Sequence, residues 1–157
     1  MNRLMRPLSY CLVALASSLV PITALADTPL RTFITPVSTH SREIAWHDNL
    51  DSGWKESQRT GRPMVIFITS ARCRYCDAMK QSTWHDLGIE NRVGNDFVAV
   101  RLSPEHNAKE LSRIQIQVYP TTIVALPQGK VVDHRKGFQP PELMHGLLNR
   151  VIRRQAG

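Results

Sequence analysis

The stretch MVIFITSARCRYCDAMK, from Met64 to Lys80, decides how this sequence is expected to fold. It begins with MVIFITS, a continuous apolar and β-branched run that predicts a fully buried central strand. Cys73 and Cys76 follow at once, with two residues between them. The segment from Cys76 to Leu87 then predicts a helix. The CxxC pair is therefore expected at the point where a buried strand turns into a helix.

Strands and helices alternate on both sides of this stretch. Before it, residues 42–46 predict a short strand, and residues 47–63 predict a helix that a glycine and a proline end. After it, Gly88 and Gly94 predict a loosened connection. The later segments predict a strand at 96–103, a helix at 105–116, two strands at 119–126 and 130–135 joined by the turn PQG, and a last helix at 140–154. This order predicts an α/β fold with a mixed sheet, parallel at first and ending in an antiparallel hairpin, with helices on both faces.

Apolar spacing assigns faces to three of these helices. In the helix at 47–63, Leu50 and Trp54 lie one turn apart. In the CxxC helix, the side chains expected to point inward are Ala78, Met79 and Thr83. In the last helix, an i, i+4 stripe is expected to face the core, formed by Leu143, Leu147, Val151, Met144, Leu148 and Ile152.

The N-terminal segment has the pattern of a secretory signal peptide. Arg3 and Arg6 make it positive, residues 8–20 are apolar, and the sequence ALA ends at Ala26. The apolar run is shorter than the roughly 20 residues that span a bilayer, so a membrane anchor is the weaker alternative. We therefore predict a signal peptide at residues 1–26, cleaved after Ala26.

The mature chain is then expected to consist of two parts. Residues 27–43 are polar with scattered prolines and predict an N-terminal arm or linker. Residues 44–157 form a single domain, and no membrane span is expected in the mature chain. The localisation predicted from the leader is outside the cytoplasm, which is the periplasm if the source is a Gram-negative bacterium.

Charge gives little indication of a nucleic-acid partner. The chain has 20 Lys and Arg residues against 13 Asp and Glu, a formal net charge of +7. Removing residues 1–26 takes away two arginines and no acid, which leaves 18 against 13, or +5. The positive charge is spread along the chain and no aromatic residues interleave it, so we expect a solvated basic surface and no nucleic-acid binding.

Several uses of the cysteine pair are disfavoured. A bridge between Cys73 and Cys76 closes a very short loop and adds little stability. Haem attachment requires a histidine after the second cysteine, where this chain has Asp77. Zinc requires four ligands, and the histidines lack a paired spacing, so no metal site is expected. The scattered histidines also give no Cys–His hydrolase pattern.

A redox pair remains, and its two cysteines are expected to differ in role. At a helix N-terminus, Cys73 is near unpaired backbone N–H groups and the positive end of the helix dipole, which favour the thiolate. Arg72 and Arg74 add positive charge and are expected to tune the couple, so the pKa falls by about one unit from the usual ~8.5. Cys73 is the expected nucleophile, and Cys76, one turn further in, is the expected resolving cysteine.

Three segments together resemble the thioredoxin-like superfamily: MVIFITSARCRYCDAMK, VYPTT and PQGKVVDHRKGF. The resemblance covers about residues 44–154. It is greatest to exported thioredoxin-like proteins with a CxxC, and the chain is also similar to the C-terminal domain of bacterial transmembrane disulfide reductases. It implies a thioredoxin-like fold in which the Tyr119–Pro120 bond is cis and faces the disulfide. The resemblance implies client binding at Tyr119, Pro120 and Thr121. Tyr75, which lies between the two cysteines, is expected to add an aromatic contact to the client.

The chain departs from the thioredoxin pattern at three places. Arg72 stands where thioredoxins have tryptophan, and Arg74 and Tyr75 stand where they have Gly-Pro. Phe67, six residues before Cys73, takes the place of a buried acid thought to move the proton of the resolving cysteine. The proton route and the redox poise are therefore expected to differ from those of a thioredoxin.

Together these features predict an exported thiol–disulfide oxidoreductase that exchanges disulfides with protein clients. The Cys73–Cys76 pair is the redox group, so no cofactor is expected, and the partners are client thiols or disulfides and a membrane or soluble redox protein. The sequence leaves the direction of electron flow open. The alternative is a non-catalytic binding module that holds a client or a soft metal such as Cu(I) between its thiolates.

Overall fold

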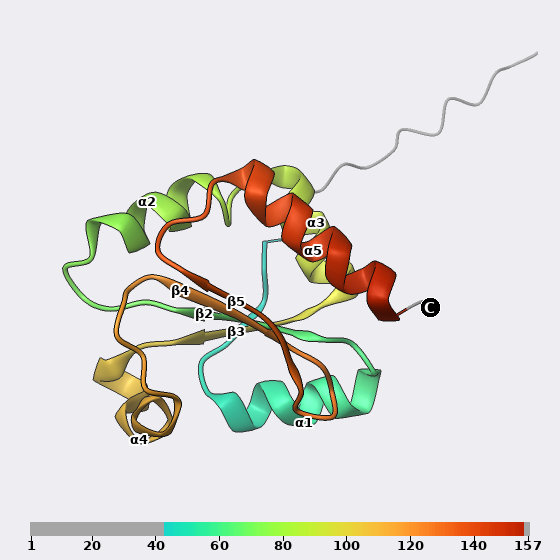
Figure 1. The fold of residues 1–157 in the computed structure, drawn as a ribbon, viewed down its shortest axis with the longest axis horizontal. Helices are drawn as coiled ribbons and strands as arrows, with labels where there is room; N and C mark the ends of the chain where they lie inside the picture. The colour runs from blue at the N-terminus through green and yellow to red at the C-terminus, as the bar shows by residue number, and fades with distance from the viewer. Residues whose placement is uncertain (1–42, 156–157) are drawn as a thin grey trace, which may run out of the picture. The chain divides into compact units, whose positions relative to one another are not determined.

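The computed structural model describes residues 43–155 of the chain. The predicted signal peptide at 1–26, and all of the predicted arm at 27–43 except Glu43, lie outside the described residues. Figure 1 shows the described part as strands with helices on either side. Its elements are β1 Trp46–His47, α1 Leu50–Thr60, β2 Met64–Ile68, α2 Arg74–Ser82, α3 Leu87–Asp96, β3 Val98–Leu102, α4 Pro104–Ile114, β4 Thr121–Ala125, β5 Val131–Lys136 and α5 Pro141–Gln155.

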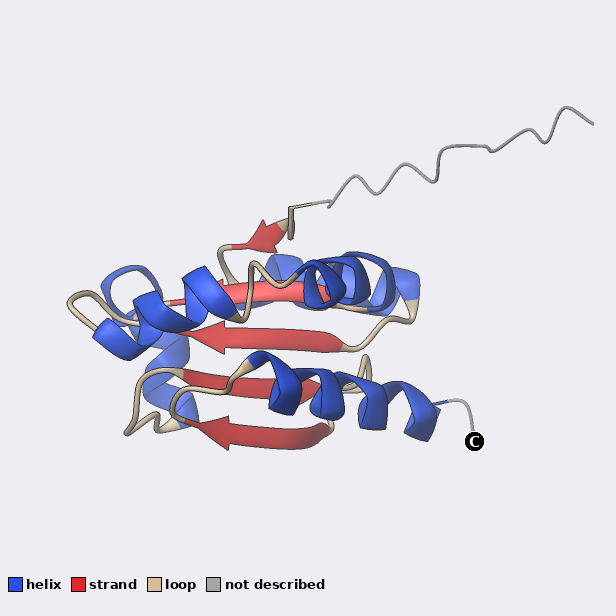
Figure 2. Ribbon diagram, turned by 90° about the horizontal axis from the view of Figure 1, so that it is seen from above, coloured by secondary structure: helices blue, strands red, loops and turns tan. Residues whose placement is uncertain are grey.

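The strands form one mixed sheet in the order β1-β3-β2-β4-β5. β3 pairs in parallel with β1 and β2, whereas β4 pairs antiparallel with β2 and with β5. Figure 2 shows the strands side by side, with the short β1 at one edge. The predicted α/β class, the mixed sheet and the closing hairpin are confirmed.

Helices cover both faces of this sheet (Figure 1): α1 and α4 lie on one side, and α2, α3 and α5 on the other. β2 is central, and its five residues are all buried, because alternate side chains enter the cores on the two faces. Val65 and Phe67 belong to the core under α2, α3 and α5. Met64, Ile66 and Ile68 belong to the core on the α1 and α4 side.

α1 is bounded by two specific caps. At its start, the Asn49 side chain accepts a hydrogen bond from the Ser52 backbone N–H at 2.8 Å. At its end, Gly61 has a φ of 71°, and its N–H donates to the Ser57 carbonyl at 2.9 Å. A residue with a Cβ is disfavoured in this left-handed conformation, so a glycine at this position favours this end of the helix.

Two glycine-to-alanine substitutions are expected to change stability in opposite directions. Neither Gly61 nor Gly94 has another atom within 4 Å of the position that a Cβ would occupy. Gly61→Ala should destabilise the fold by about 1 kcal/mol because of its positive φ. Gly94→Ala, inside α3, should stabilise it by a similar amount through helix propensity. Urea unfolding of both variants measures this, and destabilisation by both would contradict the assignment.

Four local predictions are wrong. Residues 87–96 form a helix, α3, where a loosened connection was expected, and α2 ends at Ser82, short of Leu87. Ala78 is exposed, so only Met79 and Thr83 of the expected inward set are buried. Leu143 is 59% exposed and does not belong to the apolar face of α5, whereas Met144, Leu147, Leu148 and Val151 are buried.

Candidate active site

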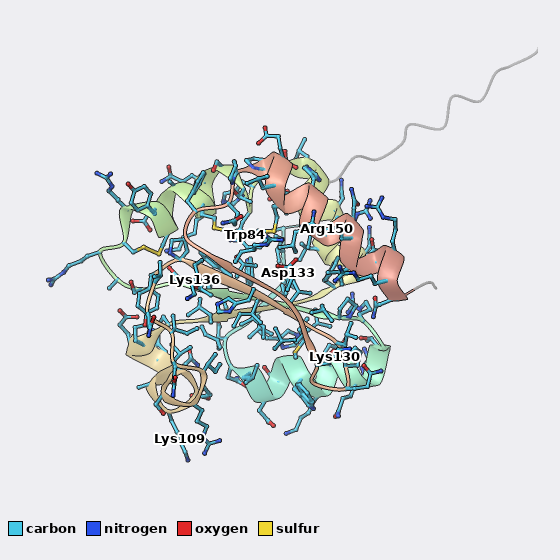
Figure 3. The ribbon with its side chains drawn as sticks, in the orientation of Figure 1. Trp84, Lys109, Lys130, Asp133, Lys136 and Arg150 are labelled. Carbon is cyan, nitrogen blue, oxygen red and sulfur yellow. A yellow bond between two sulfur atoms is a disulfide. The ribbon has the colours of Figure 1, made fainter. Side chains whose placement is uncertain are left out.

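The two cysteines lie where β2 leads into α2, and they form a disulfide. Figure 3 draws this bond at the start of α2. Cys73 is the N-cap residue, and its sulfur accepts a hydrogen bond from the Cys76 backbone N–H at 3.2 Å. The two Cα atoms are 5.2 Å apart. The Cys73 sulfur is thus held at the positive end of the α2 helix dipole, as the sequence predicts.

The two sulfur atoms differ in their environment. Cys73 is half-buried, whereas Cys76 is 0% exposed and belongs to the core under α2, α3 and α5. A reagent in solution therefore reaches Cys73 first. Cys76 can react with little except the sulfur of Cys73 unless α2 opens.

The loop before Cys73 is held by the neighbouring elements. The Thr69 backbone N–H donates to the Leu102 carbonyl at 2.9 Å. The Ala71 backbone N–H donates to a Glu105 carboxylate oxygen at 2.8 Å, and this bond holds the pKa of Glu105 below its ordinary value. Arg72 then has a φ of 56° and is exposed. The chain thereby turns from the end of the strand into the helix.

Arg74 and Tyr75 form a pair on the exposed side of the CxxC turn. The guanidinium of Arg74 donates to the Tyr75 hydroxyl at 2.7 Å and lies 4.6 Å from the centre of its ring. The hydrogen bond to Tyr75 raises the pKa of Arg74 above its ordinary value. Tyr75 is 52% exposed, so its ring is open to solvent beside the disulfide.

The VYPTT segment is more buried than the CxxC turn. The Tyr119–Pro120 bond is cis. Tyr119 is partly buried and packs against both cores, and the Pro120 carbonyl accepts from the Gly137 N–H at 2.7 Å. Thr121 is buried, and its hydroxyl donates to the Val118 carbonyl at 2.7 Å. Tyr119 and Cys73 both pack against the core that contains Cys76.

In the core that contains Cys76, an aromatic residue, Phe67, stands where thioredoxins have a buried acid. Phe67 is 1% exposed and packs against Trp84, with ring centres 5.4 Å apart, and Trp46 lies 5.2 Å from Trp84. Figure 3 shows Trp84 on the side of the sheet that α2, α3 and α5 cover. Asp77, the carboxylate nearest in sequence to Cys76, is exposed and pairs with Lys80 at 3.1 Å.

Three buried polar atoms among the described residues were not predicted as site groups. The indole nitrogen of Trp84 and the hydroxyls of Thr69 and Thr122 are buried without a hydrogen-bond partner in this part of the chain. The sequence signal for Thr122 is a polar residue directly before the apolar run of the strand, which the VYPTT resemblance alone does not single out. Within residues 43–155, no group of three or more His, Cys, Asp or Glu residues is placed to hold a metal ion. No helix in the same range is long and apolar enough to cross a membrane.

Comparisons with known proteins agree on the fold. The profile of the family described as a thioredoxin-like domain matches residues 50–152. A solved thioredoxin from Thermus thermophilus superposes with a TM-score of 0.64 at 21% identity, over 71% of this chain and 88% of that one. The oxidoreductase DsbH gives 0.57 at 13% identity, over 70% and 83%. Anterior gradient protein 3 of Mus musculus is 24% identical over 119 residues, covering 69% of this chain and 72% of the mouse protein.

Proposed function

The chain belongs to the thioredoxin-like family, and from this membership we propose that it is a thiol–disulfide oxidoreductase acting on protein clients through Cys73 and Cys76. The observation that carries the proposal is the asymmetry of the pair. A half-buried sulfur at a helix N-terminus is bonded to a fully buried sulfur one turn further in. A structural disulfide does not need one accessible partner, whereas disulfide exchange does.

The proposed reaction has two steps. The Cys73 thiolate attacks one sulfur of a client disulfide, a mixed disulfide forms, and the other client sulfur leaves as a thiolate. Cys76, as a thiolate, then attacks the Cys73 sulfur, and the second client sulfur leaves. Two electrons have passed from the Cys73–Cys76 dithiol to the client, and the leaving thiolates take protons from solvent. The pair is itself the redox group, so the reaction uses no bound cofactor.

The reverse sequence inserts a disulfide into a client, and the reduction potential relative to the surroundings decides the direction. Equilibration of the Cys73–Cys76 pair against glutathione buffers of known ratio measures this potential. For this two-electron couple, about 30 mV corresponds to a tenfold change in the equilibrium constant. Turnover with a protein substrate such as insulin tests the function itself, because a binding module does not release reduced product repeatedly.

We place the mature protein outside the cytoplasm, on the basis of the leader pattern in residues 1–26. In an oxidising compartment a reductase requires a donor that brings electrons there, so a membrane or soluble redox protein is the proposed partner. The mass of the protein recovered from the periplasm of an expressing bacterium tests this. Cleavage after Ala26 is expected, and a full-length product retained in the cytoplasm would contradict the assignment.

Client contact is proposed at the Tyr75 ring and at the backbone of Tyr119, which Pro120 and Thr121 follow. Tyr75 offers exposed apolar area without requiring a particular client sequence. The hydroxyl of Thr121 is bonded within its own loop and its backbone is paired with β2 and β5, so Thr121 would support the loop. An extended client segment pairing with the Tyr119 backbone would place its disulfide beside Cys73.

Removing the charge of Arg74 is expected to have a small effect. Arg74→Gly should raise the pKa of the Cys73 thiol by less than one unit, because an exposed charge acts through solvent. Thiolate absorbance against pH measures the change. Tyr75→Phe is the matched control, since it removes the hydroxyl that accepts from Arg74 but keeps the charge. Identical titrations of wild type and Arg74→Gly would show that this charge does not reach the sulfur.

A further inference from the structure

A buried hydroxyl group without a partner lies in β4. Thr122 is 0% exposed, and its Oγ1 has no hydrogen-bond partner within residues 43–155. Such groups are rare, because leaving a buried hydroxyl unpaired costs the hydration it has lost. The neighbouring Thr121 is the usual case, since its hydroxyl donates to a backbone carbonyl. The unpaired state of Thr122 therefore needs an explanation.

The position of Thr122 follows from the sheet. Val124 belongs to the core under α2, α3 and α5, and side chains two apart on a strand share a face, so Thr122 points into the same core. Its partner across the sheet is Phe67, which belongs to that core as well. β4 runs antiparallel to β2, so its first residues lie at the end of the sheet where β2 leads into the CxxC turn. Thr122 and Cys76 are thus buried on the same face and at the same end.

The oxidation state of Cys76 decides how strong a hydrogen-bond acceptor its sulfur is. In the disulfide, the Cys76 sulfur is neutral and a weak acceptor. On reduction the same buried sulfur becomes a thiol and must become a thiolate before it can attack. Among the described residues, no Lys, Arg or His is buried, the one buried acid is Glu90, which pairs with His85 at 3.2 Å, and Phe67 occupies the place of the family's acid. A hydroxyl donor is the kind of group that stabilises a thiolate in such surroundings.

Resting on the proposed function, we propose that Thr122 is a positioning residue for the resolving step, and that its hydroxyl donates a hydrogen bond to the Cys76 thiolate. In that step the thiolate attacks the Cys73 sulfur, the Cys73–client bond breaks, and the Cys73–Cys76 bond forms. The electron pair of the broken bond leaves with the client sulfur. The hydroxyl itself gives up no proton and lowers only the cost of deprotonating Cys76.

The experiment separates the two sulfurs by rate. Reduced protein is mixed with one equivalent of dithiobis(nitrobenzoate), which releases a coloured thiolate at each step. The first release follows attack by Cys73 and depends on concentration. The second follows resolution by Cys76 and is first order. Both phases are recorded against pH for wild type and for Thr122→Val, Thr122→Ala and Thr122→Ser.

When the rate of the second phase is plotted against pH, the curves of wild type and Thr122→Val are expected to cross. Without the hydroxyl, the pH midpoint of the second phase should rise by about one unit. A thiolate with a higher pKa is more nucleophilic, so at low pH Thr122→Val should resolve about threefold more slowly, and at high pH about threefold faster. Thr122→Ala should show the same crossing, and Thr122→Ser should match wild type. The first phase should be unchanged in all three.

A loss of packing alone would slow the reaction without making the profiles cross. Superimposable profiles for wild type and Thr122→Val, or a serine variant that behaves like valine, would overturn the proposal. Trp84→Phe and Thr69→Val each remove one of the other two unpaired buried donors among the described residues, and a crossing in one of these variants alone would assign the role to that group. Absence of a second phase in the wild-type protein would contradict the proposed function itself.

Discussion

Replacing Cys76 with serine is expected to trap the protein in covalent complexes with its clients. Cys73 is half-buried at the start of α2 and remains able to attack a client disulfide. The fully buried partner that would release the client is then missing. Mixed disulfides should appear as high-mass species on non-reducing gels and disappear with reductant. Turnover of a protein disulfide should fall to background.

Cys73→Ser is the matched variant, with the same chemical change at the other sulfur. It should lose turnover to the same extent but form no complexes, because Cys76 is 0% exposed. Complexes formed by Cys73→Ser instead would show that the roles are reversed. A wild-type protein with no turnover that binds Cu(I) through both thiols would establish the binding-module alternative.

The sequence was sufficient to predict the central part of the fold. The apolar run before the cysteines predicts β2 as a buried central strand, and β2 is buried along its whole length. The pair of strands around PQG predicts a hairpin, and β4 and β5 pair antiparallel. These predictions hold because burial on both faces and a turn between two short strands are local properties with strong sequence patterns.

The sequence underpredicts α3 because Gly88 and Gly94 have low helix propensity, although a capping residue and an apolar pattern surround them. Asp86 caps the helix by accepting from the Ile89 N–H at 3.0 Å, and Ile89 and Val93 are buried one turn apart. Both signals are present in the sequence. Gly94 is tolerated because the helix is held by burial against the core, which outweighs its propensity cost.

The sequence predicts the positions of the two cysteines but not the contacts around them. The positions of Cys73 and Cys76 follow from a strand-to-helix junction, which is local. The contact of Arg74 with Tyr75 and the unpaired hydroxyl of Thr122 depend on rotamers and on which elements meet, and a linear sequence does not specify these. The client-binding and redox-tuning roles of the flanking residues remain predictions.

Truncation of Phe67 is expected to cause a large loss of stability. Phe67 is 1% exposed in the centre of the sheet and packs against Trp46 and Trp84. Phe67→Ala should lower the free energy of unfolding by about 3–5 kcal/mol. That is a large share of the roughly 5–15 kcal/mol of a typical domain. Phe138→Ala is the matched control, because Phe138 is 36% exposed and its truncation should cost less than half as much. Equal losses in urea unfolding would contradict the central role of the aromatic cluster.

Phe67→Asp restores the acid that the resemblance places at this position, and its effect is expected to depend on pH. A carboxyl group enclosed by the two tryptophans is desolvated, so its folded-state pKa should rise above the unfolded value of about 3.9. The protonated form then folds more readily than the charged form, and stability should fall as pH rises from the unfolded toward the folded pKa. Phe67→Ala has no titrating group at this position, so its loss of unfolding free energy relative to wild type should be the same at pH values of about 4 and 8. A Phe67→Asp variant equally stable at both pH values relative to wild type would mean that water or a cation reaches this position.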